Sequence, residues 1–222
     1  MNSQIKLTGS LFILAAITFW VSWFLMPDPG TVDTMHILEK VKENRMAVIS
    51  SVIIQIISSV LYIISFFLLI RDIYAKKLML LGIGLFAIGT LGLCSDAFFH
   101  LLAWFMTDDS VTIQKDVVRV MDLMQTDGVV MLLPILLPFF AGSLMMAIGL
   151  HQQKLISRKA WVVTLAAIAV GFLSEMVISK VLGYSIPGVM LIVLGLFATG
   201  QVLMGLELIK ISQKQQLVVR PV

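Results

Sequence analysis

The chain has 222 residues, of which 59% are hydrophobic and 13% are charged, and its mean hydropathy is +1.01. This composition excludes an ordinary soluble domain and indicates that most of the chain is surrounded by lipid. The net charge of +3 comes from basic residues at the expected helix ends, which argues against nucleic-acid binding. A single cysteine, Cys94, excludes an intrachain disulfide and a CxxC motif.

The predicted fold is all-α, a polytopic membrane bundle that forms one transmembrane domain over residues 1–222. A helix needs about 20 residues to cross the hydrocarbon layer, and the apolar runs are long enough for six such helices. We expect them at about 8–26, 46–70, 78–104, 128–150, 161–180 and 189–208. The first run has no small-x-small cleavage site before its proline-rich turn, so an uncleaved helix is expected there rather than a signal peptide.

Two connecting segments have helical character of their own. Residues 32–45 carry mixed charges and predict a short helix at the membrane surface. Residues 107–127 are acidic and partly amphipathic, so we expect part of this segment to lie on the surface before it turns into the fourth span.

The charges that flank the spans predict an orientation. One side of the membrane carries more basic residues than the other, and the positive-inside rule places that side in the cytoplasm together with both termini. Its basic residues are Lys6, Arg71, Lys76, Lys77, Lys154, Arg158, Lys159, Lys210, Lys214 and Arg220, against Lys40, Lys42, Arg45, Lys115, Arg119 and Lys180 on the outer side.

The second span carries a polar stripe. Ser51, Gln55, Ser58, Tyr62 and Ser65 follow one another at spacings of three and four residues, so they share one helix face. Lipid cannot satisfy hydroxyl or amide groups, and the stripe is therefore expected to face other helices or a cavity. Hydrogen bonding between helices and a path for a ligand are both open interpretations.

The third span contains an acid and an imidazole four residues apart, Asp96 and His100, which on a helix lie on one face. A carboxylate near lipid costs roughly 2.5–3.5 kcal/mol at a helix centre, which favours an inward-facing or interfacial position. The pair offers one oxygen and one nitrogen to a metal ion, although no HExxH motif or histidine cluster accompanies it. In the first span, Trp20 and Trp23 are expected as anchors at the membrane interface.

The predicted topology brings several polar residues to the outer half of the membrane. Glu175 lies in the farther half of the fifth span and is expected at the floor of a site, with Asp96 and His100 at its mouth. The alternative is a structural ion pair between Glu175 and Lys180 at the rim. The full set of candidate ligand-binding residues is Arg45, Gln55, Tyr62, Asp96, His100, Asp127, Glu175 and Lys180.

These features favour an integral membrane protein that binds or translocates a small ligand or ion through an outer-half polar pocket, with no cofactor. No GxSxG motif or comparable nucleophile elbow is present, so an enzyme is the less favoured class. Two alternatives stay open. One is a metal-assisted intramembrane hydrolase that uses Asp96 and His100, and the other is an accessory subunit that docks a membrane partner or a second copy of itself.

Three features together resemble a bacterial family of six-helix membrane proteins that is catalogued as a domain of unknown function. They are the long first connector that starts at Pro27-Asp28, the entry of Arg45 into the second span, and the run from Gly142-Ser143-Leu144 to Ser157-Arg158-Lys159. The resemblance covers about residues 8–205. It implies a bacterial inner-membrane protein and assigns no catalytic residue.

Overall fold

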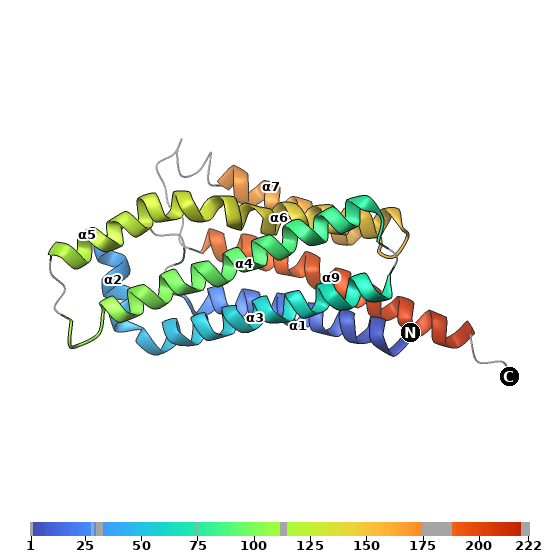
Figure 1. Cartoon of the computed structure of the whole chain (residues 1–222), viewed down its shortest axis with the longest axis horizontal. Helices are drawn as coiled ribbons and strands as arrows, with labels where there is room; N and C mark the ends of the chain where they lie inside the picture. The colour runs from blue at the N-terminus through green and yellow to red at the C-terminus, as the bar shows by residue number, and fades with distance from the viewer. Residues whose placement is uncertain are drawn as a thin grey trace.

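The computed structural model describes residues 2–27, 29, 33–73, 75–111, 115–174 and 188–218, with side chains from 4 to 213 within these ranges. Within these residues the regular structure is entirely helical (Figure 1). The helices are α1 (Asn2–Leu25), α2 (Thr34–Glu43), α3 (Arg45–Asp72), α4 (Lys77–Met106), α5 (Lys115–Leu123), the π-helical turn η1 (Met124–Gly128), α6 (Val129–Gln152), α7 (Arg158–Leu173) and α9 (Val189–Val218).

Five helices are long and apolar enough to cross a membrane, namely α1, α3, α4, the continuous helix Lys115–Gln152, and α9. The chain is therefore a multi-pass membrane protein. The predicted fifth span is only partly described. Its helix α7 has 16 residues and is about 24 Å long at 1.5 Å per residue, and residues 175–180 of that span lie outside the described part of the chain.

The segment before the fourth span differs from the prediction. No turn separates a surface helix from the span, because α5, η1 and α6 form one helix of 38 residues. At 1.5 Å per residue it is about 57 Å long, well beyond the roughly 30 Å of hydrocarbon. The backbone stays helical on both sides of η1, at Leu123 and Val129, so the π-turn accommodates the change in register without ending the helix.

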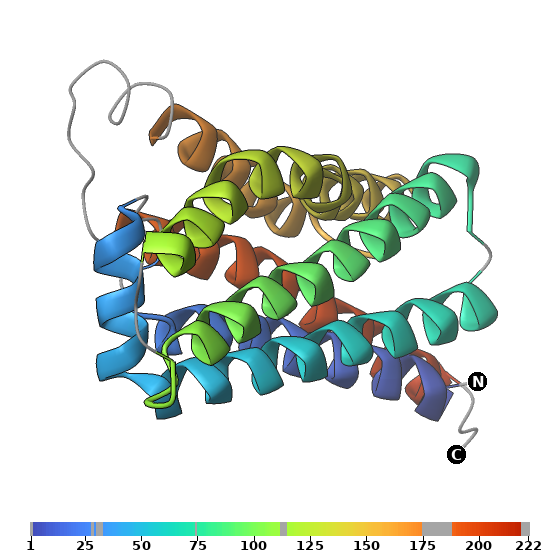
Figure 2. The same ribbon diagram turned by 60° about the vertical axis from the view of Figure 1, so that its left-hand side comes forward.

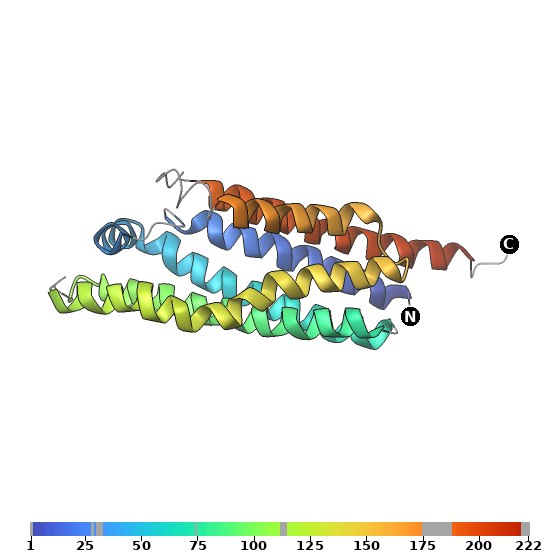
Figure 3. The same cartoon turned by 90° about the horizontal axis from the view of Figure 1, so that it is seen from above.

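The long helices are arranged in three layers. Helices α7 and α9 lie on one side, α4 and α6 on the other, and α1 and α3 lie between them (Figure 3). The most extensive pairing joins α4 to α6, followed by the pairings of α1 with α9 and with α3. The start of α1 and the end of α9 lie at the same end of the bundle (Figure 1).

Glycines explain why α4 and α6 approach so closely. A Cβ atom added to Gly89 would overlap the backbone of Phe139, and one added to Gly142 would overlap the backbone of Phe86. At Gly92 the added atom would lie 2.7 Å from the carbonyl oxygen of Ile135. The missing side chains at these glycines therefore allow the two helices to pack closely.

Helix α2 covers one end of the bundle, which we call the α2 end (Figure 2). Asp33 caps this helix, since its side chain accepts a hydrogen bond of 3.0 Å from the backbone N–H of His36. The buried residues Leu38 and Val41 pack with Met121 of α5 and with apolar residues at the ends of α1, α3 and α4. The expected short helix within residues 32–45 is thus present.

Candidate functional site

The polar stripe of α3 faces the protein interior, and its five residues are buried. Ser51 donates a hydrogen bond of 2.6 Å to the carbonyl oxygen of Ser22, and Ser58 donates one of 2.8 Å to that of Ala15. Both acceptors belong to α1. These two serines therefore form hydrogen bonds between helices, which is the first of the two interpretations of the stripe.

Gln55, in the same stripe, connects α3 to α4. Its Nε2 atom donates to the carbonyl oxygen of Leu93 at 3.1 Å and to Oδ2 of Asp96 at 2.8 Å. Because a backbone carbonyl only accepts hydrogen bonds, the contact with Leu93 fixes which end of the amide carries the nitrogen. Gln55 is buried, so Asp96 receives an N–H donor from inside the bundle.

Asp96 and His100 lie on one face of α4, as their spacing predicts. Nε2 of His100 is 3.4 Å from Oδ2 of Asp96, the same oxygen that Gln55 contacts. The side chain of Asp96 is 15% exposed and that of His100 is 25% exposed, so the pair lies close to the protein surface but is mostly covered. Nε2 of His100 is itself buried and has no hydrogen-bond partner among the described residues.

Trp23 completes this cluster from α1. Its ring contacts the imidazole of His100 edge to face, with centroids 6.0 Å apart and planes at 89°. Its Nε1 atom is buried and has no partner in the described part of the chain. Hydropathy predicts an interfacial anchor at Trp23 and gives no signal for this contact, because the side of α1 that meets α4 is decided by packing.

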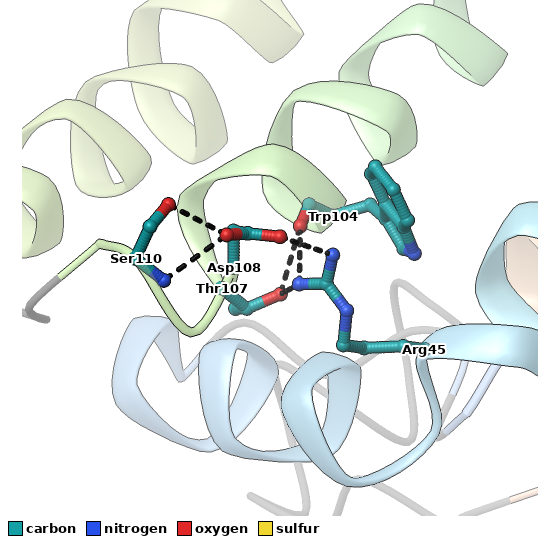
Figure 4. A network of polar contacts seen from close by, with 5 residues as sticks. All are labelled: Arg45, Trp104, Thr107, Asp108 and Ser110. Carbon is teal, nitrogen blue, oxygen red and sulfur yellow. Dashed lines mark hydrogen bonds and ion pairs between the residues drawn. The ribbon is translucent and has the colours of Figure 1, made fainter.

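Arg45 lies in a separate network at the α2 end (Figure 4). Its guanidinium donates to the carbonyl oxygen of Trp104 at 2.9 Å and to Oγ1 of Thr107 at 3.3 Å, and it pairs with Oδ2 of Asp108 at 3.0 Å. It also stacks over the indole of Trp104, 4.2 Å from the ring centroid. Arg45 thus stabilises the carboxyl end of α4 and does not contact Asp96.

Asp108 in this network is held as a carboxylate. The hydroxyl of Ser110 donates to its Oδ1 atom at 2.6 Å and the backbone N–H of Ser110 at 3.0 Å. These two hydrogen bonds lower the pKa of Asp108 more than partial desolvation raises it, and the nearby charge of Arg45 lowers it further.

Tyr62 lies in a third polar cluster, in the middle of the bundle. Its hydroxyl donates to Oε1 of Gln201 on α9, and Nε2 of Gln201 lies 3.5 Å from Oγ of Ser143 on α6. All three residues are fully buried. Phenylalanine rings contact Tyr62 on several sides, among them Phe86 at 5.2 Å and Phe12 at 5.5 Å between centroids. Tyr62 is therefore part of the packed core.

The remaining predicted residues do not join the cluster in the described structure. Asp127 lies in η1, and its exposed side chain forms no hydrogen bond or ion pair with another described residue. Glu175 and Lys180 lie outside the described residues. Within the described ranges, no three residues of the types His, Cys, Asp and Glu are grouped closely enough to hold a metal ion.

Comparisons with protein-family models, curated proteins and solved structures found no match to this chain. A functional assignment therefore rests on the chemistry of Gln55, Asp96, His100 and Trp23.

Proposed function

We propose that the chain is a six-span protein of the bacterial cytoplasmic membrane with both termini in the cytoplasm. An even number of spans agrees with the start of α1 and the end of α9 lying at one end of the bundle, with α7 as part of the additional span (Figure 1). The start of α4 and the start of α7 lie at that end (Figure 1), next to the basic residues Lys76 and Arg158, and the positive-inside rule assigns that end to the cytoplasm. The α2 end is then the outer end.

We further propose that the outer half binds a small ligand or ion at Gln55, Asp96 and His100. The observation that supports this is the carboxylate of Asp96, which lies between a buried amide donor at 2.8 Å and an imidazole nitrogen at 3.4 Å that has no described hydrogen-bond partner. A carboxylate in a membrane span is costly, and ionisable residues that face the bundle interior typically mark a ligand or ion pathway. An unpartnered nitrogen beside it gives a ligand a place to bind.

The opposing interpretation is a closed structural cluster that water does not enter. Cysteine labelling separates the two. In a Cys94→Ser background, Gln55→Cys and His100→Cys are each treated from the outer side with a charged, membrane-impermeant thiol reagent. We expect labelling at both positions, since thiols react as thiolates and these form only where water reaches.

Two control positions make the result interpretable. The first is Phe98→Cys, on the same helix as His100. The side chain of Phe98 is 56% exposed and faces lipid, so a cysteine there should stay unlabelled. Asp109→Cys, on the exposed loop after α4, should be labelled from outside. Labelling of position 109 from the cytoplasmic side would overturn the orientation, and protection of both 55 and 100 with label at 109 would overturn the site.

The metal-assisted hydrolase needs ligands beyond the two that Asp96 and His100 supply. Elemental analysis of the purified protein tests it. A stoichiometric divalent ion that is lost in His100→Ala would favour the hydrolase, and a metal-free protein that keeps the labelling pattern would favour the ligand site.

A further inference from the structure

We propose that α5 is a hinged gate over the outer site: it turns about η1, separates from α2 and uncovers Trp104, which lies one helical turn beyond His100 on α4. The inference rests on the proposed function, because it describes how the ligand of that site enters. It concerns a different part of the molecule, since both the hinge and the gate belong to the long helix Lys115–Gln152.

The π-turn η1 lies at the level of the outer site. Contacts between α4 and α6 fix the register of these two helices. A Cβ atom added to Gly92 would lie 2.7 Å from the carbonyl oxygen of Ile135, and one added to Gly128 would lie 2.8 Å from the ring of Phe99. Gly128 ends η1, and Phe99 directly precedes His100. A hinge at this turn therefore lies beside the binding residues and leaves the tightly packed inner part of α6 in place.

The backbone of η1 suits a hinge. The N–H of Val129 reaches back to the carbonyl oxygen of Met124, five residues away, where an α-helix spans four. The hydroxyl of Thr126 donates to the carbonyl oxygen of Asp122 at 2.9 Å, a type of contact that helps a helix to bend. Sharp bends in long helices occur at such π-turns. The helix can therefore bend at η1 while α6 stays paired with α4.

The segment outside the hinge is held differently from the segment inside it. Glycines bring α6 against the backbone of α4, whereas the main partner of α5 beyond its own helix is α2. Thr34 of α2 donates to Oδ1 of Asp122 at 3.5 Å, which is a long hydrogen bond at an exposed position. The apolar contacts include the thioether side chains of Met121 and Met124, which are unbranched and repack readily. Separating α5 from α2 should therefore cost less than separating α6 from α4.

The gate covers a side chain whose polar atom has no partner. Trp104 packs in the same apolar cluster as Met121 of α5, and its Nε1 atom is buried without a hydrogen-bond partner among the described residues. An indole N–H only donates, so no change of tautomer can supply a partner while the gate is closed. Water that enters through an open gate supplies one, which lowers the free-energy cost of opening.

The same unmet donor recurs on the way to the site. Nε1 of Trp23 is also buried without a described partner, and the ring of Trp23 contacts His100. His100 and Trp104 are four residues apart on α4 and therefore lie on one side of that helix. The two indoles thus mark a route from the gate to His100.

Iodide quenching of tryptophan emission tests the gate, because iodide stays in water and reaches an indole only where water does. Each protein and its Trp104→Phe counterpart are titrated with iodide in lipid nanodiscs, and the difference gives the emission of Trp104. In a Cys94→Ser background, Thr34→Cys and Asp122→Cys are joined by a short bis-methanethiosulfonate reagent, which locks α5 to α2. We expect the lock to lower the quenching of Trp104, and cleavage of the link by dithiothreitol to restore it.

Two controls show whether the lock acts through α5. The same reagent applied to Met79→Cys and Gln153→Cys joins α4 to α6 at the other end, where Nε2 of Gln153 lies 3.1 Å from Sδ of Met79, and it should leave the quenching unchanged. Without any link, Asp122→Ala removes the acceptor of Thr34 and should raise the quenching constant of Trp104 by about 2- to 5-fold. Asp122→Asn keeps an acceptor oxygen and should not raise it.

The outcomes separate the gate from the site. Quenching of Trp104 that is the same with and without the lock, while His100→Cys is labelled from the outer side, would overturn the gate and leave the site in place. Absence of label at both 55 and 100 would contradict the proposed function, whatever the lock does to Trp104. Quenching that falls equally when positions 79 and 153 are linked would show that the whole bundle opens and would exclude a hinge at η1.

Discussion

Two polar clusters in the described part of the bundle, one around Tyr62 and one around Asp96, differ in one respect. In the central cluster, Tyr62 donates to Gln201 and Gln201 approaches Ser143, and aromatic rings enclose the group. In the outer cluster, Gln55 donates to Asp96, but Nε2 of His100, which lies 3.4 Å from Asp96, and Nε1 of Trp23 have no hydrogen-bond partner among the described residues. Both include a residue of the same polar stripe of α3, since Gln55 and Tyr62 lie seven residues apart on it.

The difference separates a structural role from a binding role. A buried polar group without a partner costs about 1–3 kcal/mol, so a cluster whose members bond one another stabilises the fold, while one with unpaired members sacrifices stability. Natural proteins keep such costs mainly where function needs them. Substitutions should therefore destabilise the central region and alter ligand binding in the outer one.

The largest effect is expected at Gly89, beside the central cluster. In Gly89→Ala the added Cβ would overlap the backbone of Phe139 and push α4 away from α6. We expect a loss of about 3 kcal/mol or more in the free energy of unfolding, measured by denaturant titration in detergent. The matched control is Gly84→Ala on the same helix, where an added Cβ meets nothing within 4 Å and the change should stay within about 1 kcal/mol. Equal effects at both positions would contradict the close pairing of α4 with α6.

Tyr62→Phe should have the next largest effect. It removes the hydroxyl that donates to Gln201 and leaves a buried amide oxygen without a donor. The expected loss of unfolding free energy is about 1–3 kcal/mol, with cysteine labelling at position 100 unchanged. As a control, Ser95→Ala removes a partly exposed hydroxyl that bonds only to its own helix, at Leu91, and should change little. Loss of labelling at position 100 in Tyr62→Phe would show that the two clusters are coupled.

Asp96→Asn should leave stability nearly unchanged although it alters the proposed site. The side-chain oxygen of asparagine still accepts the hydrogen bond from Gln55, and a charge is removed from the span. We expect a free energy of unfolding within about 1 kcal/mol of the wild type, or slightly higher. A destabilisation as large as that of Tyr62→Phe would instead indicate that Asp96 has a structural role.

The smallest effect concerns Asp108, at the outer end. Its folded-state pKa lies below the reference value of 3.8, so the ionised group stabilises the fold above that pH and the contribution is lost as the pH falls through the lower folded value. Ser110→Ala removes the hydrogen bond from the hydroxyl, and acid unfolding followed by circular dichroism should then begin at a slightly higher pH. Asp109→Asn, an exposed neighbour, should leave the acid midpoint unchanged.

The sequence alone determined the membrane class and most helix positions, because a long apolar run has few alternatives to a helix in lipid. It also placed Asp96 and His100 on one face and turned the polar stripe of α3 inward, since both follow from the period of the helix. These are properties of single helices, which local sequence describes well.

Only the tertiary structure decided which polar residues meet. Arg45 and Gln55 are both on α3, yet Arg45 bonds to the end of α4 and Gln55 to Asp96. Tyr62 was grouped with the outer residues by its position in the stripe, whereas packing places it against Gln201 of α9. Trp23 gave no local signal of its contact with His100. The order and rotation of helices depend on side-chain packing among segments far apart in the chain, and the period of one helix contains no information about its neighbours.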